Sequence, residues 1–368
     1  MNGSNPAGGR RAVLVCMAKR TIPTLPGLWR ILLAVLTVLP LTAHRSPLPA
    51  QTAPSHFKKL AHTYSIVAWD SVTGDLGVAV QSKFPNVGGI VPWAKAGVGA
   101  VATQSLSNTA YGEQGLELLA RGAKAEEALR AVMKGDTMLG DRQVGMVDAH
   151  GGSASFTGRN TFDWAGGRVG VPGRALGLPG GKGDVIAGRG YAAQANIMVS
   201  DQTVKGMAES FERSTGDLSS RLLAALKAGQ AGGGDKRGMQ SAAILVVRKN
   251  GGYLGANDRF IDIRVYDAKD PIAELERLLV LHRLHFFPSE PADVVPITLA
   301  MVRQLEPILL SEPANQPEKW LAKPQGVVNQ TFLDALRNFM YWENYDVRVR
   351  MDGRIDRVVL NDIMAKRK

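Results

Sequence analysis

The chain has 368 residues, of which 45% are hydrophobic and 21% charged, as is ordinary for a soluble protein. Its formal net charge of +11 comes largely from residues 1–50, which hold six Lys or Arg and no acidic residue. The remainder has 38 basic and 33 acidic residues, a net charge of +5, with no basic helix or aromatic-interleaved basic patch. We therefore expect no nucleic-acid partner.

Residues 1–43 have the pattern of a secretory signal peptide. A basic flank ending at Arg30 precedes the apolar run 31–41, and the sequence Leu41-Thr42-Ala43 follows as a cleavage region. The run is short and contains Pro40, so it is a poor membrane span. The alternative is an uncleaved anchor. We predict an exported protein, periplasmic or secreted, of bacterial type.

The single cysteine, Cys16, also lies in this segment, so the mature chain is expected to have no disulfide, thiol chemistry or Cys-ligated metal. Met17 is an alternative start, because the signal is complete from there. Residues 44–62 contain Pro and Ser without periodicity, and we predict a linker or pro-segment.

An antiparallel hairpin is predicted over residues 63–83, since two apolar runs flank the turn Thr73-Gly74-Asp75. Thr63 opens the first strand and Lys83 closes the second. Antiparallel pairing brings these ends together, so we expect Thr63 and Lys83 to be neighbours.

The rest of the chain alternates between blocks of strands and helices. We predict strands at 97–104, 143–148, 153–156, 241–248 and 260–265, and helices at 112–121, 124–134, 204–213, 217–227 and 271–284. The glycine-rich stretch 166–190 is predicted to be a surface loop. Such blocks with hairpin connections indicate an α+β fold of antiparallel sheets covered by helices.

Several motifs occur in the order of a known family. They occupy residues 63–68 (TYSIVA), 77–84 (GVAVQSKF), 91–104, 108–112, 194–197 and 233–241, followed by Asp258, Arg259 and Asp262. Residues 63 to about 280 resemble the family called domain of unknown function 1028, placed in the superfamily of N-terminal nucleophile (Ntn) hydrolases. The resemblance implies a four-layer α/β/β/α sandwich over residues 63–287.

A second unit is predicted over residues 288–368, with helical patterns at 293–310, 329–342 and 355–364. The segment 332–356 resembles the small peptidoglycan-binding-like tail of some family members. The alternatives are a packing extension and an oligomerisation element.

The resemblance implies that Thr63 is the nucleophile. In an Ntn hydrolase the side chain of residue one attacks an amide carbonyl and its α-amine is the base. Lys83 would favour the alkoxide and the developing oxyanion. Because 62 residues precede Thr63, a cut between His62 and Thr63 is required, and self-cleavage is expected. The alternative is that Thr63 merely starts a strand and Lys83 is solvated.

Three amides are further candidates. Asn108 would donate to the oxyanion or hold a substrate amide, although a turn-forming Asn is the more common explanation. Gln194 and Asn196 belong to a strand that is otherwise apolar, including Ile197 to Val199. They are candidates for substrate binding in the cleft, or else strand-edge residues.

The glycine-rich loop 233–241 supplies the last candidates, since loops that enter a sheet often carry site residues. Asp235 and Ser241 would orient the amine, and Arg237 would bind a substrate carboxylate. The alternative is an internal salt bridge.

We therefore expect an exported, metal-free and cofactor-free amidohydrolase that cleaves an amide or peptide bond of a small-molecule or peptide substrate. His282 and His285 have no third ligand near them in the sequence to frame a metal site. Peptidoglycan is a candidate partner of the tail, and a homo-oligomer is expected. The alternative is a non-catalytic Ntn-fold protein that binds a small ligand or the cell envelope.

Overall fold

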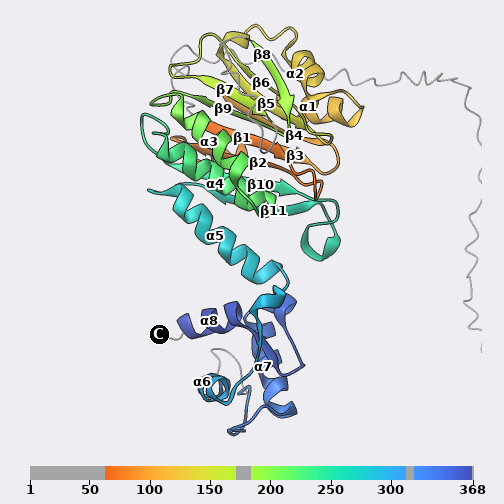
Figure 1. The fold of residues 1–368 in the computed structure, drawn as a ribbon, viewed down its shortest axis with the longest axis vertical. Coiled ribbons are helices and arrows are strands. Elements are labelled where there is room, and N and C mark those ends of the chain that lie inside the picture. The colour runs from red at the N-terminus through yellow and green to blue at the C-terminus, as the bar shows by residue number, and fades with distance from the viewer. Residues whose placement is uncertain (1–62, 171–183, 312–318, 367–368) are drawn as a thin grey trace, which may run out of the picture. The chain divides into compact units, whose positions relative to one another are not determined.

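The computed structural model describes residues 63–170, 184–311 and 319–366. The predicted signal peptide 1–43 and linker 44–62 lie outside the described residues. The described chain has a mixed α+β fold with two large antiparallel sheets, a two-stranded ribbon and eight α-helices (Figure 1). The antiparallel α+β class predicted from the sequence is confirmed at this level.

The larger sheet has six strands in the order β11-β10-β2-β1-β9-β7. Their bounds are β1 (Thr63–Trp69), β2 (Leu76–Ser82), β7 (Gly166–Gly170), β9 (Tyr191–Asn196), β10 (Ser241–Val247) and β11 (Arg259–Val265). The predicted hairpin is confirmed, because β1 and β2 pair antiparallel. Thr63 pairs with Ser82 on one side and Asn196 on the other, so it lies inside the sheet rather than at its edge.

The smaller sheet has five strands, β3 (Pro92–Lys95), β4 (Gly99–Ser105), β5 (Arg142–Asp148), β6 (Gly152–Thr157) and β8 (Val185–Arg189), each paired antiparallel with the next. The prediction of one surface loop over 166–190 was wrong at both ends, where β7 and β8 complete the two sheets. Close packing explains the glycines of β7: a Cβ on Gly167 would lie 2.6 Å from Ser155 Oγ.

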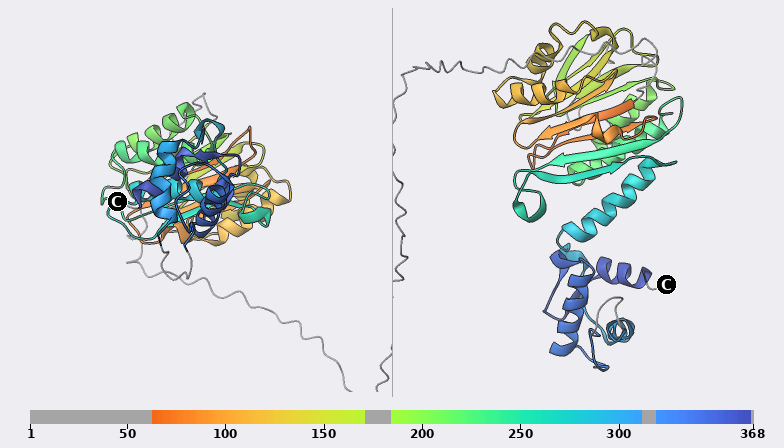
Figure 2. Two further views of the ribbon diagram at one scale, coloured as in Figure 1. Left: turned by 90° about the horizontal axis from the view of Figure 1, so that it is seen from below. Right: turned by 180° about the vertical axis from the view of Figure 1, so that it is seen from behind.

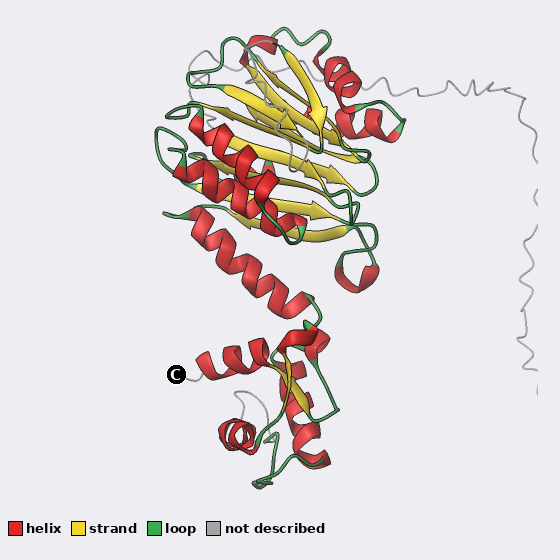
Figure 3. Ribbon diagram, in the orientation of Figure 1, coloured by secondary structure: helices red, strands yellow, loops and turns green. Residues whose placement is uncertain are grey.

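Three hydrophobic clusters join the helices to the sheets and the two sheets to each other. Helices α1 (Ala110–Ala120) and α2 (Ala125–Met133) pack on the five-stranded sheet, with Leu129 against Met146 in one cluster. Helices α3 (Gln202–Arg213), α4 (Leu218–Ala231) and α5 (Pro271–Phe286) pack on the six-stranded sheet, as Figure 3 shows for α3 and α4. A third cluster combines residues of both sheets, including Val78 and Val147. Side chains between the sheets are therefore shielded from water.

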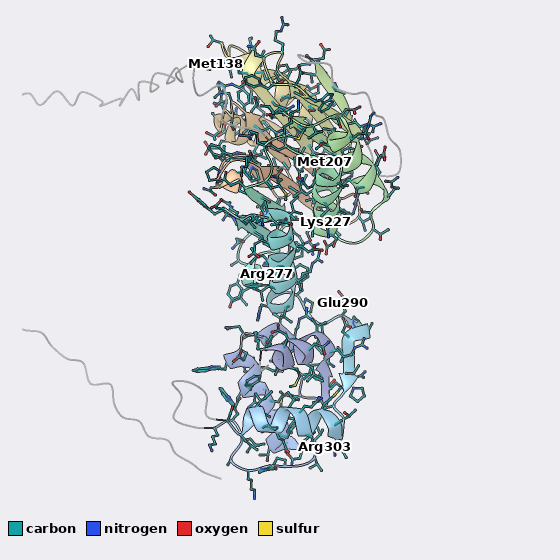
Figure 4. All side chains as sticks on the ribbon, turned by 90° about the vertical axis from the view of Figure 1, so that its left-hand side faces the viewer. Met138, Met207, Lys227, Arg277, Glu290 and Arg303 are labelled. Carbon is teal, nitrogen blue, oxygen red and sulfur yellow. The ribbon has the colours of Figure 1, made fainter. Side chains whose placement is uncertain are left out.

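Local signals define the helices over the six-stranded sheet. The Asp217 side chain caps α4 by accepting from the Ser220 amide, and Asp270 caps α5 with Pro271 in the first turn. Lys227 of α4, labelled in Figure 4, forms a 2.9 Å ion pair with Glu276 of α5. The pair is exposed, so the helices are stabilised mainly by their apolar faces.

Residues beyond α5 form a separate hydrophobic cluster, to which α5 contributes Leu284. The elements there are β12 (Val294–Pro296), α6 (Leu299–Leu309), α7 (Gln330–Trp342), β13 (Arg354–Asp356) and α8 (Arg357–Ala365), visible in the right-hand view of Figure 2. The helix predicted from residue 293 begins only at Leu299, because β12 pairs with β13 and Thr298 caps α6. Among the described residues, no helix combines the length and the apolarity that a bilayer crossing requires.

Candidate functional site

Thr63 is 2% exposed at the start of β1. Its hydroxyl donates to Ser82 Oγ at 3.1 Å. Its carbonyl oxygen accepts from Gln104 Nε2 at 3.1 Å and from Asn196 Nδ2 at 3.4 Å. Both the side chain and the main chain of this residue are therefore fixed in the interior.

The Thr63 carbonyl accepts hydrogen bonds from a buried set of polar side chains that we call the glutamine network. Its side chains come from both sheets: Ser65, Gln104, Gln143, Gln194 and Asn196. Gln104 and Gln143 are register partners on β4 and β5, and Gln104 Nε2 donates to Gln143 Oε1 at 2.7 Å. Ser65 Oγ donates to Gln104 Oε1 at 2.5 Å, and Asn196 Nδ2 donates to Gln143 Oε1 at 2.8 Å. The network thus connects the two sheets by hydrogen bonds at the position of Thr63.

Gln194 completes this network by donating from Nε2 to Ser65 Oγ at 2.7 Å. The room for it comes from Gly145, because a Cβ there would lie 2.2 Å from Gln194 Oε1. Both amides predicted on β9, Gln194 and Asn196, therefore face the space between the sheets. The strand itself ends at Asn196, because Ile197 has a φ of +59°. Sequence reasoning missed Ser65, Gln104 and Gln143. The sequence marked them only as polar residues of strands that also contain apolar residues.

Lys83 follows β2 and is exposed. Its Nζ donates to the Met239 carbonyl at 3.1 Å, and its backbone N–H donates to Asp235 Oδ2 at 3.4 Å. The register partner of Thr63 is Ser82, and successive side chains point to opposite faces of a sheet. The structure therefore brings Ser82, rather than Lys83, to the Thr63 hydroxyl.

Asp235, Arg237 and Ser241 hold the loops at the end of β2. The buried Asp235 carboxylate accepts from Arg237 Nη2 at 2.9 Å, which is the internal salt bridge of the alternative interpretation. Ser241 Oγ donates to the Phe84 carbonyl at 2.5 Å and accepts from the Val87 amide at 3.1 Å. These three side chains support the surroundings of β2, and their hydrogen bonds go to groups other than the Thr63 hydroxyl.

Asn108 lies just before α1. Its Oδ1 accepts from the Ala110 amide at 3.2 Å, and its carbonyl accepts from Thr103 Oγ1 at 3.1 Å. These are the contacts of a turn-forming Asn. The structure thus gives Asn108 a local role and does not join it to the glutamine network.

Tyr64 lies on the opposite face of β1 from Thr63, in the cluster with α3 and α4. Burial raises its pKa well above the ordinary value, and the charge of Asp235 raises it further. Its hydroxyl donates to Gln230 Oε1 at 3.3 Å. Tyr64 therefore remains protonated and is a donor, not a base.

Two cavities of about 470 Å³ each lie elsewhere. One is lined by the β3–β4, α1–α2 and β5–β6 connections, and the other by β3, β10 and β11. Thr63 lines neither of them. Within the described ranges, no three His, Cys, Asp or Glu side chains gather in an arrangement that would hold a metal ion.

Comparison with known proteins gives a family and a solved relative. The family of unknown function DUF1028 matches residues 63–177 and 178–275. A crystal structure of a Silicibacter pomeroyi protein, described with the same family, is 28% identical with a TM-score of 0.51. The match covers 60% of this chain and 86% of that chain. No curated protein matches.

Proposed function

We propose that this chain, which belongs to the family of unknown function DUF1028, is an exported Ntn-type amidohydrolase with Thr63 as its N-terminal nucleophile. One observation carries the proposal. Thr63 starts an interior strand with its hydroxyl buried and its carbonyl bound by two amides from different strands. A cut directly before this residue would create an α-amine beside a hydroxyl that is already fixed.

The layering supports the same assignment. Helices α1 and α2 pack on one sheet, α3 to α5 pack on the other, and a hydrophobic cluster lies between the sheets. We propose that this is the four-layer α/β/β/α sandwich of the Ntn superfamily. In that arrangement the glutamine network would lie at the centre of the molecule, beside the nucleophile.

The proposed reaction needs no group beyond the chain and water. The α-amine of a cut Thr63, with a pKa of roughly 7.7–8.0, accepts the hydroxyl proton as Oγ1 attacks the substrate carbonyl. The C–N bond breaks, the leaving amine takes the proton, and an ester to Thr63 remains. Water then hydrolyses the ester and restores the hydroxyl. Ser82 Oγ, 3.1 Å from Thr63 Oγ1, orients the nucleophile.

Lys83 takes no part in proton transfer in this mechanism, because its Nζ donates to the Met239 carbonyl. We assign to Lys83, Asp235 and Ser241 the role of fixing the end of β2. The substrate would be a small molecule or peptide with an amide bond, and Arg237 would meet a substrate carboxylate only by leaving Asp235.

A second candidate is a non-catalytic protein that binds a small ligand or the cell envelope. The observation in its favour is that the two cavities of about 470 Å³ lie away from Thr63. The state of residue 63 separates the candidates, because only the hydrolase needs a free amine there.

The decisive experiment is intact-mass spectrometry with N-terminal sequencing of protein from the exported fraction. We expect the mature chain to begin at Thr63. Thr63→Ala is expected to accumulate the uncut precursor, whereas Thr63→Ser, which keeps a hydroxyl, is still cut. A mature chain that begins near His44 would mean that the nucleophile is masked, and the binding protein would become the better proposal.

We also propose that residues 288–368 dock on peptidoglycan. The test compares the full chain with a chain lacking residues 288–368 in sedimentation with cell-wall preparations. The full chain is expected to sediment and the shortened chain to stay in solution. Sedimentation of both would show that the tail does not dock, and a changed native mass would assign it to oligomerisation.

A further inference from the structure

One of the two cavities has features of a ligand site that the hydrolase does not use. It has a volume of about 470 Å³ and lies where three connections converge, at Gly97 and Val98, at Gly122 to Lys124, and at Asp148 to Gly152. Arg189, the last residue of β8, completes its lining. The volume is within the range of small-molecule pockets.

This cavity is separate from Thr63. Strand β4 runs from one to the other: Gly99 pairs with Asp148 at the cavity, and Gln104 contacts the Thr63 carbonyl. Five residues of a strand span about 17 Å. A molecule in the cavity would therefore not touch the proposed nucleophile.

The inner wall of the cavity is apolar. Val98 and Ala149 come from the turns of the five-stranded sheet, and Leu119 and Ala123 come from the end of α1 and the residues after it. Leu119 is 6% exposed and belongs to the hydrophobic cluster beneath α1 and α2. A hydrocarbon group on this wall would replace contact with water by contact with aliphatic side chains.

The rim of the cavity is basic. Lys124, His150 and Arg189 are exposed there. In residues 63–170, 184–311 and 319–366, the side chains of Lys124 and Arg189 have no ion-pair partner, unlike Arg142 or Arg248, each of which binds an aspartate. Two cations therefore lie at the mouth of an apolar cavity, and neither forms an ion pair with any residue that the structure describes.

The one acidic residue of the lining, Asp148, forms no ion pair with these cations. Its Oδ1 accepts from the amides of His150 and Gly152, both at 2.9 Å, and its Oδ2 accepts from the Ala125 amide at 3.1 Å. The residue is 7% exposed, and its carboxylate holds the β5–β6 turn to the start of α2. It is thus bound to backbone donors rather than to the two cations.

From this arrangement we infer that the cavity binds a small amphipathic anion, namely a carboxylate on a short hydrocarbon chain. The carboxylate pairs with Lys124 and Arg189 at the rim, and the hydrocarbon packs on Val98 and Leu119. The site is a binding site with no covalent step. It stands independently of whether Thr63 is catalytic.

Isothermal titration calorimetry on the full chain tests the inference, with octanoate as the probe. Octanoate is expected to bind at least tenfold more tightly than acetate, which lacks the chain, or octylammonium, which has the opposite charge. The double variant Lys124→Gln/Arg189→Gln is expected to weaken octanoate binding at least tenfold. The control Lys134→Gln/Arg159→Gln removes two exposed cations outside the cavity lining and is expected to bind octanoate normally.

A second variant keeps the charge and changes the wall. Ala123→Leu occupies part of the cavity and is expected to weaken octanoate binding while leaving circular dichroism unchanged. The inference is overturned if octanoate does not bind the wild-type chain or if octylammonium binds equally well. It is also overturned if both double variants bind octanoate with the same affinity.

Discussion

At the scale of single residues, Gln143 was not among the candidates read from the sequence, yet its side chain bonds to residues of both sheets. Its Nε2 donates to Thr157 Oγ1 and to the Ala195 carbonyl, both at 2.9 Å. Its Oε1 accepts from Gln104 and Asn196. Because the side chain is fully buried, each lost bond would leave a polar atom without water to replace its partner.

Gln143→Met is therefore expected to lower the free energy of unfolding by roughly 1–3 kcal/mol. Methionine has a similar size but makes none of these hydrogen bonds, so the buried partners of Gln143 are left unpaired. Urea unfolding measures the change. The control is Gln202→Met, where the glutamine is exposed at the start of α3, and a change within about 0.5 kcal/mol is expected. Equal effects in the two variants would contradict a structural role for the network.

Lys83 illustrates why site residues are harder to predict than the hairpin that carries them. The apolar pattern and the Gly74 turn located the hairpin, but contact at Thr63 depends on register to the single residue. Because side chains alternate across a strand, the shift from Lys83 to Ser82 changes the face and the chemistry. Gln104 bonds to the Thr63 carbonyl from the other sheet, and no local pattern encodes that contact.

At the scale of elements, every α-helix in the described residues was predicted, whereas several strands were not. Helix α5 begins at Pro271, as predicted, because Asp270 and Pro271 form a local start signal. Strands β7 and β8 were missed, because β7 is rich in glycine and both strands depend on partners distant in the sequence. Local caps, periodicity and the tight turn of a hairpin can be read from a sequence, whereas pairing between strands that are distant in the sequence cannot.

The connection between α2 and β5 is held by a carboxylate, Asp136, whose contribution to stability depends on pH. Asp136 accepts from Arg142 Nε at 2.8 Å and from the Tyr111 hydroxyl at 2.5 Å. Burial alone would raise the pKa of Asp136, but the hydrogen bonds of Arg142 and Tyr111 outweigh it and lower the pKa to about 2. The folded pKa is below the ordinary 3.8, so the carboxylate stabilises the fold above about pH 4, and this contribution is lost as the pH falls toward 2.

Asp136→Asn is thus expected to lower the free energy of unfolding by roughly 1–2 kcal/mol at pH 7, with the difference from wild type vanishing near pH 2. Urea unfolding between pH 2 and pH 7 gives the curve. Asp184→Asn changes an exposed carboxylate of the same sheet region and serves as the control. A difference that stays constant with pH would exclude the charged form of Asp136 as its source.

At the scale of the whole molecule, two hydrophobic clusters share one helix. Ile272, Leu275 and Leu279 of α5 belong to the cluster of the six-stranded sheet, whereas Leu284 belongs to the C-terminal cluster. Arg348 donates to the carbonyls of Leu284 and Arg283, both at 2.9 Å, and so binds the last turn of α5. The two clusters have separate members, which indicates that the first can form without the second.

A chain truncated after Phe287 is therefore expected to keep a cooperative thermal unfolding transition. Loss of the Arg348 bonds should fray the last turn of α5, and a cost of about 1 kcal/mol would lower the Tm by roughly 2–4 °C. Circular dichroism measures the transition, and hydrogen exchange at residues 280–286 measures the fraying. Aggregation or loss of the transition would mean that the C-terminal cluster is part of one folding unit.

The composition of the glutamine network has a consequence for kinetics. Its side chains are amides and a hydroxyl, and none of them gains or loses a proton across the range in which enzymes are assayed. The charge of the glutamine network around Thr63 therefore does not change with pH in this range. If the processed chain hydrolyses amides, the rising limb of its pH–rate profile is expected to follow a single ionisation, that of the α-amine of residue 63. Acetylation of that amine should abolish the limb and the activity together.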